Sequence, residues 1–207
     1  MALSASFGAG GSVIGPAVAE QLGVPFVDRA IPLAVAQRLH VPYDDAAAHD
    51  NQAATSWLER ALSGFAGSDA GAPAPLPADT VNSEDFRRAT EEVLLQRART
   101  GSGVILGRGA VALLRDDPRA LRVRLDGPVE ARVRQAMHLD PRLGEEDARR
   151  MLRDFDRTHA AYLHQFYGAD IHDCGLYHVV LDSTAIGFDE CAGLIVRAAQ
   201  SLAGTAI

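Results

Sequence analysis

Three closely spaced glycines near the start of the chain are the residues best suited to bind a phosphate group. The stretch reads SFGAGGS from Ser6 to Ser12 and contains Gly8, Gly10 and Gly11. Glycines let the backbone turn tightly and approach a ligand closely, and the N–H groups at a helix N-terminus attract anions. The stretch follows an apolar run and precedes a helical pattern, so it has the form of a phosphate-binding loop.

The lysine that such loops normally carry is absent from this one. Gly11 occupies its place, directly before Ser12, whose hydroxyl is positioned to hold Mg²⁺ as the serine or threonine of a phosphate-binding loop does. All 20 basic residues of the chain are arginines, so no lysine elsewhere replaces it. Two interpretations stay open on these residues alone: a nucleotide site that works without lysine, and a glycine-rich turn between a strand and a helix.

Candidate phosphate-binding arginines occur further along the chain. Arg108 follows a strand candidate in VILGRGA, which places it at the ligand edge of a sheet. Arg149, Arg153 and Arg157 share one helical face, where three like charges repel unless an anion binds them. Arg153 has the fewest acidic neighbours and is the favoured one. The alternative is a solvated, charged helix with three local ion pairs: Glu145 with Arg149, Glu146 with Arg150, and Asp154 with Arg157.

Strands alternate with helices along the chain. The expected strands are 2–6, 25–28, 104–106, 121–125 and 177–181, and the expected helices are 14–22, 31–39, 55–65, 83–99, 128–138, 145–166 and 189–202. Residues 66–80 have no periodicity and predict a flexible loop. The pattern predicts an α/β fold with an open, mostly parallel sheet, and ligands of such sheets gather at the carboxyl ends of the strands.

Composition limits the classes of partner. The 207 residues fit one domain, and the net charge of −7 argues against a broad nucleic-acid surface, although a local arginine pocket could bind a small anion. Cys174 and Cys191 have no metal-ligand spacing around them. The first basic residue is Arg29, and no apolar run is long enough to cross a membrane. A cytoplasmic protein is expected, with homo-oligomerisation left open.

These motifs together resemble the cytidylate kinase-like family, a divergent branch of the nucleoside monophosphate kinases. The resemblance is carried by SFGAGGSVIGPAVAEQLGVPFVDRAI, VILGRGA, LRDFDRTHAAY and YHVVLDSTAIGFDE. The divergent branch often has a second glycine in place of the lysine, as here. The resemblance implies a P-loop NTPase-type three-layer fold with a central five-stranded sheet and helices on both faces. It also implies an acceptor-binding helical region over 31–100 and a helical lid over 139–175.

The resemblance also implies an activity and a set of site residues. The activity is phosphoryl transfer from ATP, with Mg²⁺, to a small phosphorylated acceptor, by resemblance a nucleoside monophosphate such as CMP. Gly109 replaces the aspartate of the family's Gly-Arg-Asp, which leaves selectivity for cytosine open. A nucleotide-binding protein without kinase activity and a kinase of another small metabolite are the alternatives. The implied residues are Gly8, Ala9, Gly10, Gly11 and Ser12 for ATP, Asp28, Arg29 and Arg108 for the acceptor, and Arg153 and Arg157 for catalysis.

Overall fold

The structure is a computed structural model that describes residues 1–29, 103–107 and 109–205. The expected acceptor-binding region 31–100, its loop 66–80 and Arg108 lie outside the described residues. The backbone of Asp28 and Arg29 is described, but their side chains are not.

A parallel sheet forms the centre of the described structure. Its strands are β1 (Ala2–Ala5), β2 (Phe26–Arg29), β3 (Val104–Gly107), β4 (Arg122–Asp126) and β5 (Val179–Asp182). They lie in the order β2-β3-β1-β4-β5, and every neighbouring pair is parallel. The α/β fold with a parallel sheet, expected from the alternation of elements, is therefore confirmed. Because β1 is central, the loop that follows it has strands on both sides.

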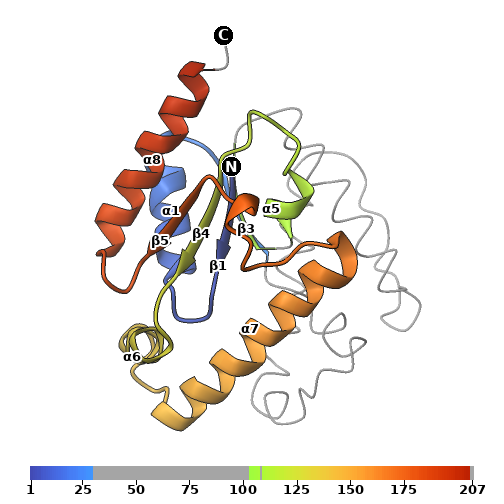
Figure 1. Cartoon of the computed structure of the whole chain (residues 1–207). Coiled ribbons are helices and arrows are strands. Elements are labelled where there is room, and N and C mark those ends of the chain that lie inside the picture. The colour runs from blue at the N-terminus through green and yellow to red at the C-terminus, as the bar shows by residue number, and fades with distance from the viewer. Residues whose placement is uncertain (30–102, 108, 206–207) are drawn as a thin grey trace, which may run out of the picture. The chain divides into compact units, whose positions relative to one another are not determined.

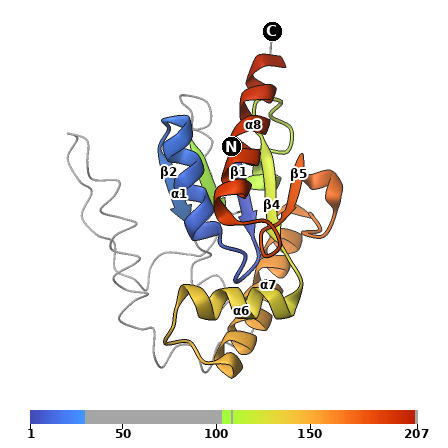
Figure 2. The ribbon, with the colours of Figure 1, turned by 90° about the vertical axis from the view of Figure 1, so that its left-hand side faces the viewer.

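Helices flank the sheet. They are α1 (Gly11–Leu22), α5 (Ala110–Leu113), α6 (Val129–Leu139), α7 (Glu145–Tyr167) and α8 (Phe188–Thr205), with a short 3₁₀ turn, η1, at Cys174–Leu176. Helices α1 and α8 pack together against one face (Figure 1). Helix α5 packs on β1 and β3 and contacts α7. Helix α6 packs against α7 near the end of the sheet where β1 and β4 finish (Figure 2).

The two faces of the sheet differ in chemistry. Leu3, Val123 and Leu125 are buried with Ile14 and Ile195 in the apolar core beneath α1 and α8. Successive side chains of a strand point to opposite faces, so the neighbours of these residues face the other way. Ser4 and Arg124 are such neighbours, and both are buried. One face thus holds the fold together, and the other places polar groups beside the candidate site.

Helix α7 begins and ends where local sequence signals favour it. Glu145, Glu146 and Asp147 lie in its first turn, where negative charge complements the helix dipole. Gly168 follows its last residue in the left-handed conformation that commonly ends helices. Within the described residues, no helix has both the length and the hydrophobicity needed to cross a bilayer.

Candidate phosphate-binding site

The loop between β1 and α1 depends on two glycines. Gly8 and Gly10 have φ of 76° and 72°, which side-chain-bearing residues rarely adopt. A Cβ atom on Gly8 would overlap the main-chain oxygen of Arg132, and one on Gly10 would overlap the ring of Phe188. Both positions therefore need glycine for two reasons: the backbone angle, and the close approach of α6 and α8.

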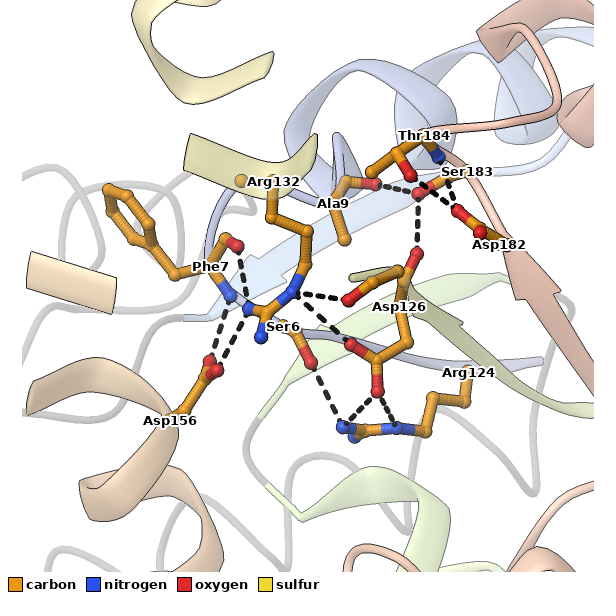
Figure 3. A network of polar contacts seen from close by, with 12 residues as sticks. Ser6, Phe7, Ala9, Arg124, Asp126, Arg132, Asp156, Asp182, Ser183 and Thr184 are labelled. Carbon is orange, nitrogen blue, oxygen red and sulfur yellow. Dashed lines mark hydrogen bonds and ion pairs between the residues drawn. The ribbon is translucent and has the colours of Figure 1, made fainter. Parts of the chain in front are cut away.

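Side chains from elsewhere in the fold hold three successive carbonyl groups of the loop, and Figure 3 shows the contacts to Phe7 and Ala9. The donors come from α6 and from the turn after β5. Arg132 Nη1 donates to Phe7 O at 2.9 Å, Gln135 Nε2 donates to Gly8 O at 2.8 Å, and Ser183 Oγ donates to Ala9 O at 2.7 Å. These contacts fix the orientation of three peptide groups, so the shape of the loop is set before any ligand binds.

Most N–H groups of the loop, unlike these three carbonyl groups, have no hydrogen-bond partner among the described residues. Within the described residues, the N–H groups of Gly8, Gly10, Gly11 and Ser12 donate no hydrogen bond. The next two helical N–H groups already bond to Gly10 O, at 3.0 and 2.9 Å. Unpaired N–H groups at a helix N-terminus are suited to a phosphate group.

The place of the missing lysine is filled by a neighbouring strand residue. A Cβ atom on Gly11 would lie 2.6 Å from Ala5 Cβ and 3.2 Å from Leu106 Cδ1. Phosphate-binding loops with lysine have glycine six residues earlier, at the position that Ala5 occupies here. In the sequence these two departures are six residues apart. In the fold they are adjacent, so the Ala5 methyl group occupies space that the stem of a lysine would need.

Arg132 connects the loop to three other segments. Its side chain is 6% exposed, and its Nε donates to Gly127 O at 2.9 Å. Its Nη1 donates to Phe7 O and lies 2.8 Å from Asp156 Oδ2, and its Nε lies 3.4 Å from Asp126 Oδ1. Asp156 Oδ1 also accepts from Phe7 N at 3.1 Å. The charge of Arg132 is thus engaged by two carboxylates and two carbonyl groups.

Arg124 forms a second buried contact at the start of the loop. Its Nη2 donates to Ser6 Oγ and to Asp126 Oδ2, both at 2.9 Å. Burial opposes ionisation of Asp126, but the charge of Arg124 and hydrogen bonds outweigh burial and lower the pKa of that carboxyl. The ionised pair therefore persists at neutral pH.

A pocket of about 40 Å³ lies beside these two arginines, large enough for ordered water. Two of its lining residues carry buried nitrogens that have no hydrogen-bond partner in the described part of the chain, Arg124 Nη1 and His159 Nδ1. Burial, with the charge of Arg124, lowers the pKa of His159 to about 4. His159 is therefore neutral at physiological pH. The lining residues are Ser6, Arg124, Asp126, Arg132, Asp156, His159, Ile171 and His172.

The buried neutral His159 predicts a loss of stability in mild acid. The unfolded state binds the proton near pH 6.5 and the folded state only near pH 4, so stability falls as the pH drops between these values. We expect the free energy of unfolding to fall by about 2 kcal/mol between pH 7.5 and pH 5. Urea titrations at both values should show this loss in the wild type and in His138→Gln, an exposed control. His159→Gln should remove most of it, and an unchanged loss in that variant would contradict the assignment.

The arginines that share one face of α7 differ in whether they form ion pairs. Arg149 pairs with Glu130 and with Glu145, the latter at 2.8 Å. Arg157 pairs with Asp154 at 3.1 Å, and its side chain is 53% exposed. The expectation of three unpaired, mutually repelling charges is therefore wrong for two of them, because carboxylates one turn away lie within reach. Arg153 is exposed and forms no ion pair within the described residues.

One expected local pair also differs. Arg150 pairs with Asp147 at 2.7 Å, three residues before it, and no pair with Glu146 forms within the described residues. Both spacings place side chains on the same helical face, so either carboxylate could have served.

Sequence reasoning missed the residues that shape the loop, although two of them carried a signal. Arg124 lies within a strand whose neighbours are apolar, and Arg132 falls on the same stripe of α6 as Val133 and Ala136. A charged residue in an apolar pattern is rarely buried without partners, so each arginine indicated a buried ion pair. Gln135 carried no such signal.

The model of the cytidylate kinase-like family matches residues 1–185. The chain belongs to the cytidylate kinase-like family. The resemblance drawn from the sequence motifs is thereby confirmed. Comparison with curated proteins found no match.

Solved structures agree with this membership at the level of the fold. An uncharacterized protein from Eubacterium ventriosum has a TM-score of 0.66 at 17% identity, over 97% of each chain. A gluconokinase from Sinorhizobium meliloti has a TM-score of 0.51 at 18% identity, over 100% of this chain and 96% of that one. At these identities the similarity establishes the shared fold.

Proposed function

We propose that this member of the cytidylate kinase-like family transfers a phosphoryl group from ATP to a small phosphorylated acceptor. Family membership supports a small-molecule kinase as the class of activity. The observation that carries the proposal is the loop after β1. Its carbonyl groups are held by Arg132, Gln135 and Ser183, whereas N–H groups at the start of α1 remain unpaired within the described residues.

The loop residues fit the phosphates of ATP and a magnesium ion. The unpaired N–H groups of Gly8, Gly10, Gly11 and Ser12 would bind phosphate oxygens, and the exposed Ser12 hydroxyl would hold Mg²⁺. The N–H group of Ala9 already donates to Ser6 O at 3.0 Å. The described residues contain no cluster of histidine, cysteine and carboxylate ligands for a metal. This fits Mg²⁺, which usually binds through one or two protein groups, water and substrate phosphates. The ion would neutralise charge on the transferring phosphate.

The acceptor is the least constrained part of the proposal. Asp28, Arg29 and Arg108 are the proposed contacts, and CMP is the first acceptor to consider. A Cβ atom on Gly109, where the family pattern has aspartate, would overlap the ring of Tyr167. No aspartate can therefore stand at this position without displacing Tyr167. Selectivity for cytosine is therefore left to the comparison of acceptors below.

A nucleotide-binding protein without kinase activity is the second candidate. Ala5 occupies the space that the stem of a lysine at position 11 would need. Arg132 contacts the loop backbone, but its guanidinium is already engaged by two carboxylates and two carbonyl groups. Among the described residues, no contact seen in the structure restores the lysine charge beside the loop. This candidate predicts nucleotide binding without turnover.

Calorimetry and a turnover assay distinguish these functions. ATP and pyrophosphate should bind to the wild type, and Mg²⁺ should strengthen ATP binding. ADP release, followed by a coupled assay, should then require both Mg²⁺ and an acceptor. The acceptors to compare are CMP, UMP, AMP, GMP, and the phosphates of sugars and sugar acids.

Each outcome of the assay selects one function. Faster ADP release with one acceptor identifies a kinase and its substrate class. ATP binding with no ADP release for any acceptor favours the second candidate. A protein that binds neither ATP nor pyrophosphate contradicts both, because both require the loop to bind phosphate.

A further inference from the structure

The peptide groups on either side of Phe7 are held from two helices at once. Asp156 Oδ1, on α7, accepts from Phe7 N at 3.1 Å, and Arg132 Nη1, on α6, donates to Phe7 O at 2.9 Å. The two side chains also pair with each other, with 2.8 Å between Arg132 Nη1 and Asp156 Oδ2 (Figure 3). We call Phe7, Arg132 and Asp156 the Phe7 clamp. It closes a ring of contacts around the second residue of the loop.

The clamp joins a buried arginine to a half-buried aspartate. The side chains of Arg132 and Asp156 are 6% and 30% exposed. Phe7 also packs on Phe155, the neighbour of Asp156, with 6.1 Å between ring centroids. Opening the clamp would leave the buried Arg132 with Asp126, 3.4 Å away, as its one remaining carboxylate partner among the described residues, so the clamp resists opening. Polar and apolar contacts thus fix the same two segments together.

The clamp lies next to the part of the loop that would bind phosphate. Gly8, the next residue, has its oxygen held by Gln135 at 2.8 Å, and α6 approaches so closely that Gly8 has no room for a side chain. A rotation of the Phe7 peptides would therefore displace Gly8 and the N–H groups that follow. The loop keeps its shape only while α6 and α7 keep theirs.

We propose that Asp156 and Arg132 are positioning residues that couple the packing of α7 and α6 to phosphate binding by the loop. They act through the Phe7 peptides and touch no phosphate themselves. Coupling of this kind is reciprocal, so phosphate binding should stabilise the helix pair as much as the pair stabilises the loop. The proposal rests on the proposed function only in requiring that the loop binds phosphate.

The clamp has a consequence for the lid implied by the family resemblance. Asp156 lies at the middle of α7, and the 23-residue helix is continuous from Glu145 to Tyr167. Rigid rotation of this helix would break the contacts to Phe7. The middle of α7, at Asp156, would then stay in place when a ligand binds. Any movement that closes the site over the ligand would come from other segments.

Hydrogen exchange and pyrophosphate binding test the clamp in the full-length protein. Phe7 and Ala9 carry the hydrogen-bonded N–H groups of the loop. In Asp156→Ala, amide exchange of these two residues should become at least about tenfold faster without ligand, while α8 stays protected. Pyrophosphate affinity should fall by about tenfold or more, because the loop must then be ordered on binding. Asp156→Asn keeps an oxygen that can accept from Phe7 N, so it should recover part of both effects.

Asp147→Asn is the matched control, since Asp147 forms an ion pair with Arg150 on the same helix without contacting the loop. It should behave as the wild type. Exchange and affinity within twofold of the wild type in Asp156→Ala would overturn the proposal. If Asp156→Ala does not fold, wild-type exchange of Phe7 and Ala9 in Asp156→Asn, with wild-type affinity, would overturn it equally. A wild type that binds no pyrophosphate contradicts the proposed function and the coupling to phosphate, whereas exchange still decides whether the clamp orders the loop.

Discussion

Replacing Gly11 by lysine is expected to destabilise the protein, although it restores the residue that phosphate-binding loops usually have. The new Cβ atom would lie 2.6 Å from Ala5 Cβ, and neither atom belongs to a flexible side-chain end that could move away. Overpacking of this kind costs about 1–3 kcal/mol. Thermal unfolding should show a Tm lower by about 2–4 °C for each kcal/mol lost.

The double variant Ala5→Gly/Gly11→Lys tests whether crowding between the side chains at positions 5 and 11 causes the loss of stability. Ala5→Gly alone should cost about 0.5–1 kcal/mol, because glycine weakens a strand. If the two positions crowd each other, the double variant should be more stable than the sum of the single changes by about 1 kcal/mol or more. It should also bind ATP more tightly than the wild type, because a lysine charge reaches the phosphates. A Gly11→Lys protein as stable as the wild type would refute the steric explanation.

Arg153→Ala is expected to reduce turnover by about 10³-fold while the stability of the fold barely changes. An arginine that stabilises charge on the transferring phosphate contributes about this factor. Arg153 is exposed and has no ion pair within the described residues, so its removal breaks no contact seen in the structure. Arg157→Ala should have a smaller effect on turnover, because Arg157 shares its charge with Asp154.

The measurement combines kcat with the acceptor selected by the turnover assay and the Tm of each variant. Arg119→Ala is the control, because Arg119 is exposed, pairs with Asp117, and belongs to the turn before β4. The Arg119→Ala variant should keep the kcat and the Tm of the wild type. Wild-type turnover in both Arg153→Ala and Arg157→Ala would show that neither arginine takes part in phosphoryl transfer. The hypothesis that an arginine of α7 replaces the missing lysine would then be wrong.

Local signals in the sequence indicated the loop and most of the described elements, but not the short helix α5. The glycines of SFGAGGS follow a short apolar run, and the helix after them begins at Gly11, three residues before its expected start. Helix α7 begins at Glu145, as expected, and ends at Tyr167, one residue beyond its expected end. These features depend on contacts within a few residues, so the order of residues alone determines them. Strand ends differed by one or two residues because the pairing of neighbouring strands decides them.

The fold decided which distant residues meet at the loop. The strand order places β4 beside β1, which brings Asp126 and Arg124 to Ser6. Ser183 lies 174 residues from Ala9 in sequence, yet its hydroxyl holds that carbonyl. No local pattern encodes such pairs, because they arise only when the parallel strands end at one edge of the sheet.

The missing lysine shows most clearly what the sequence determines and what only the tertiary structure decides. The sequence alone determined that position 11 is glycine and that no lysine exists to replace it. Only the tertiary structure showed that Ala5 and Leu106 fill the space beside Gly11 and that Arg132 is held by Asp156 and the Phe7 peptide. The reason is that van der Waals contact and burial depend on atoms from β1, β3, α6 and α7 meeting at one point.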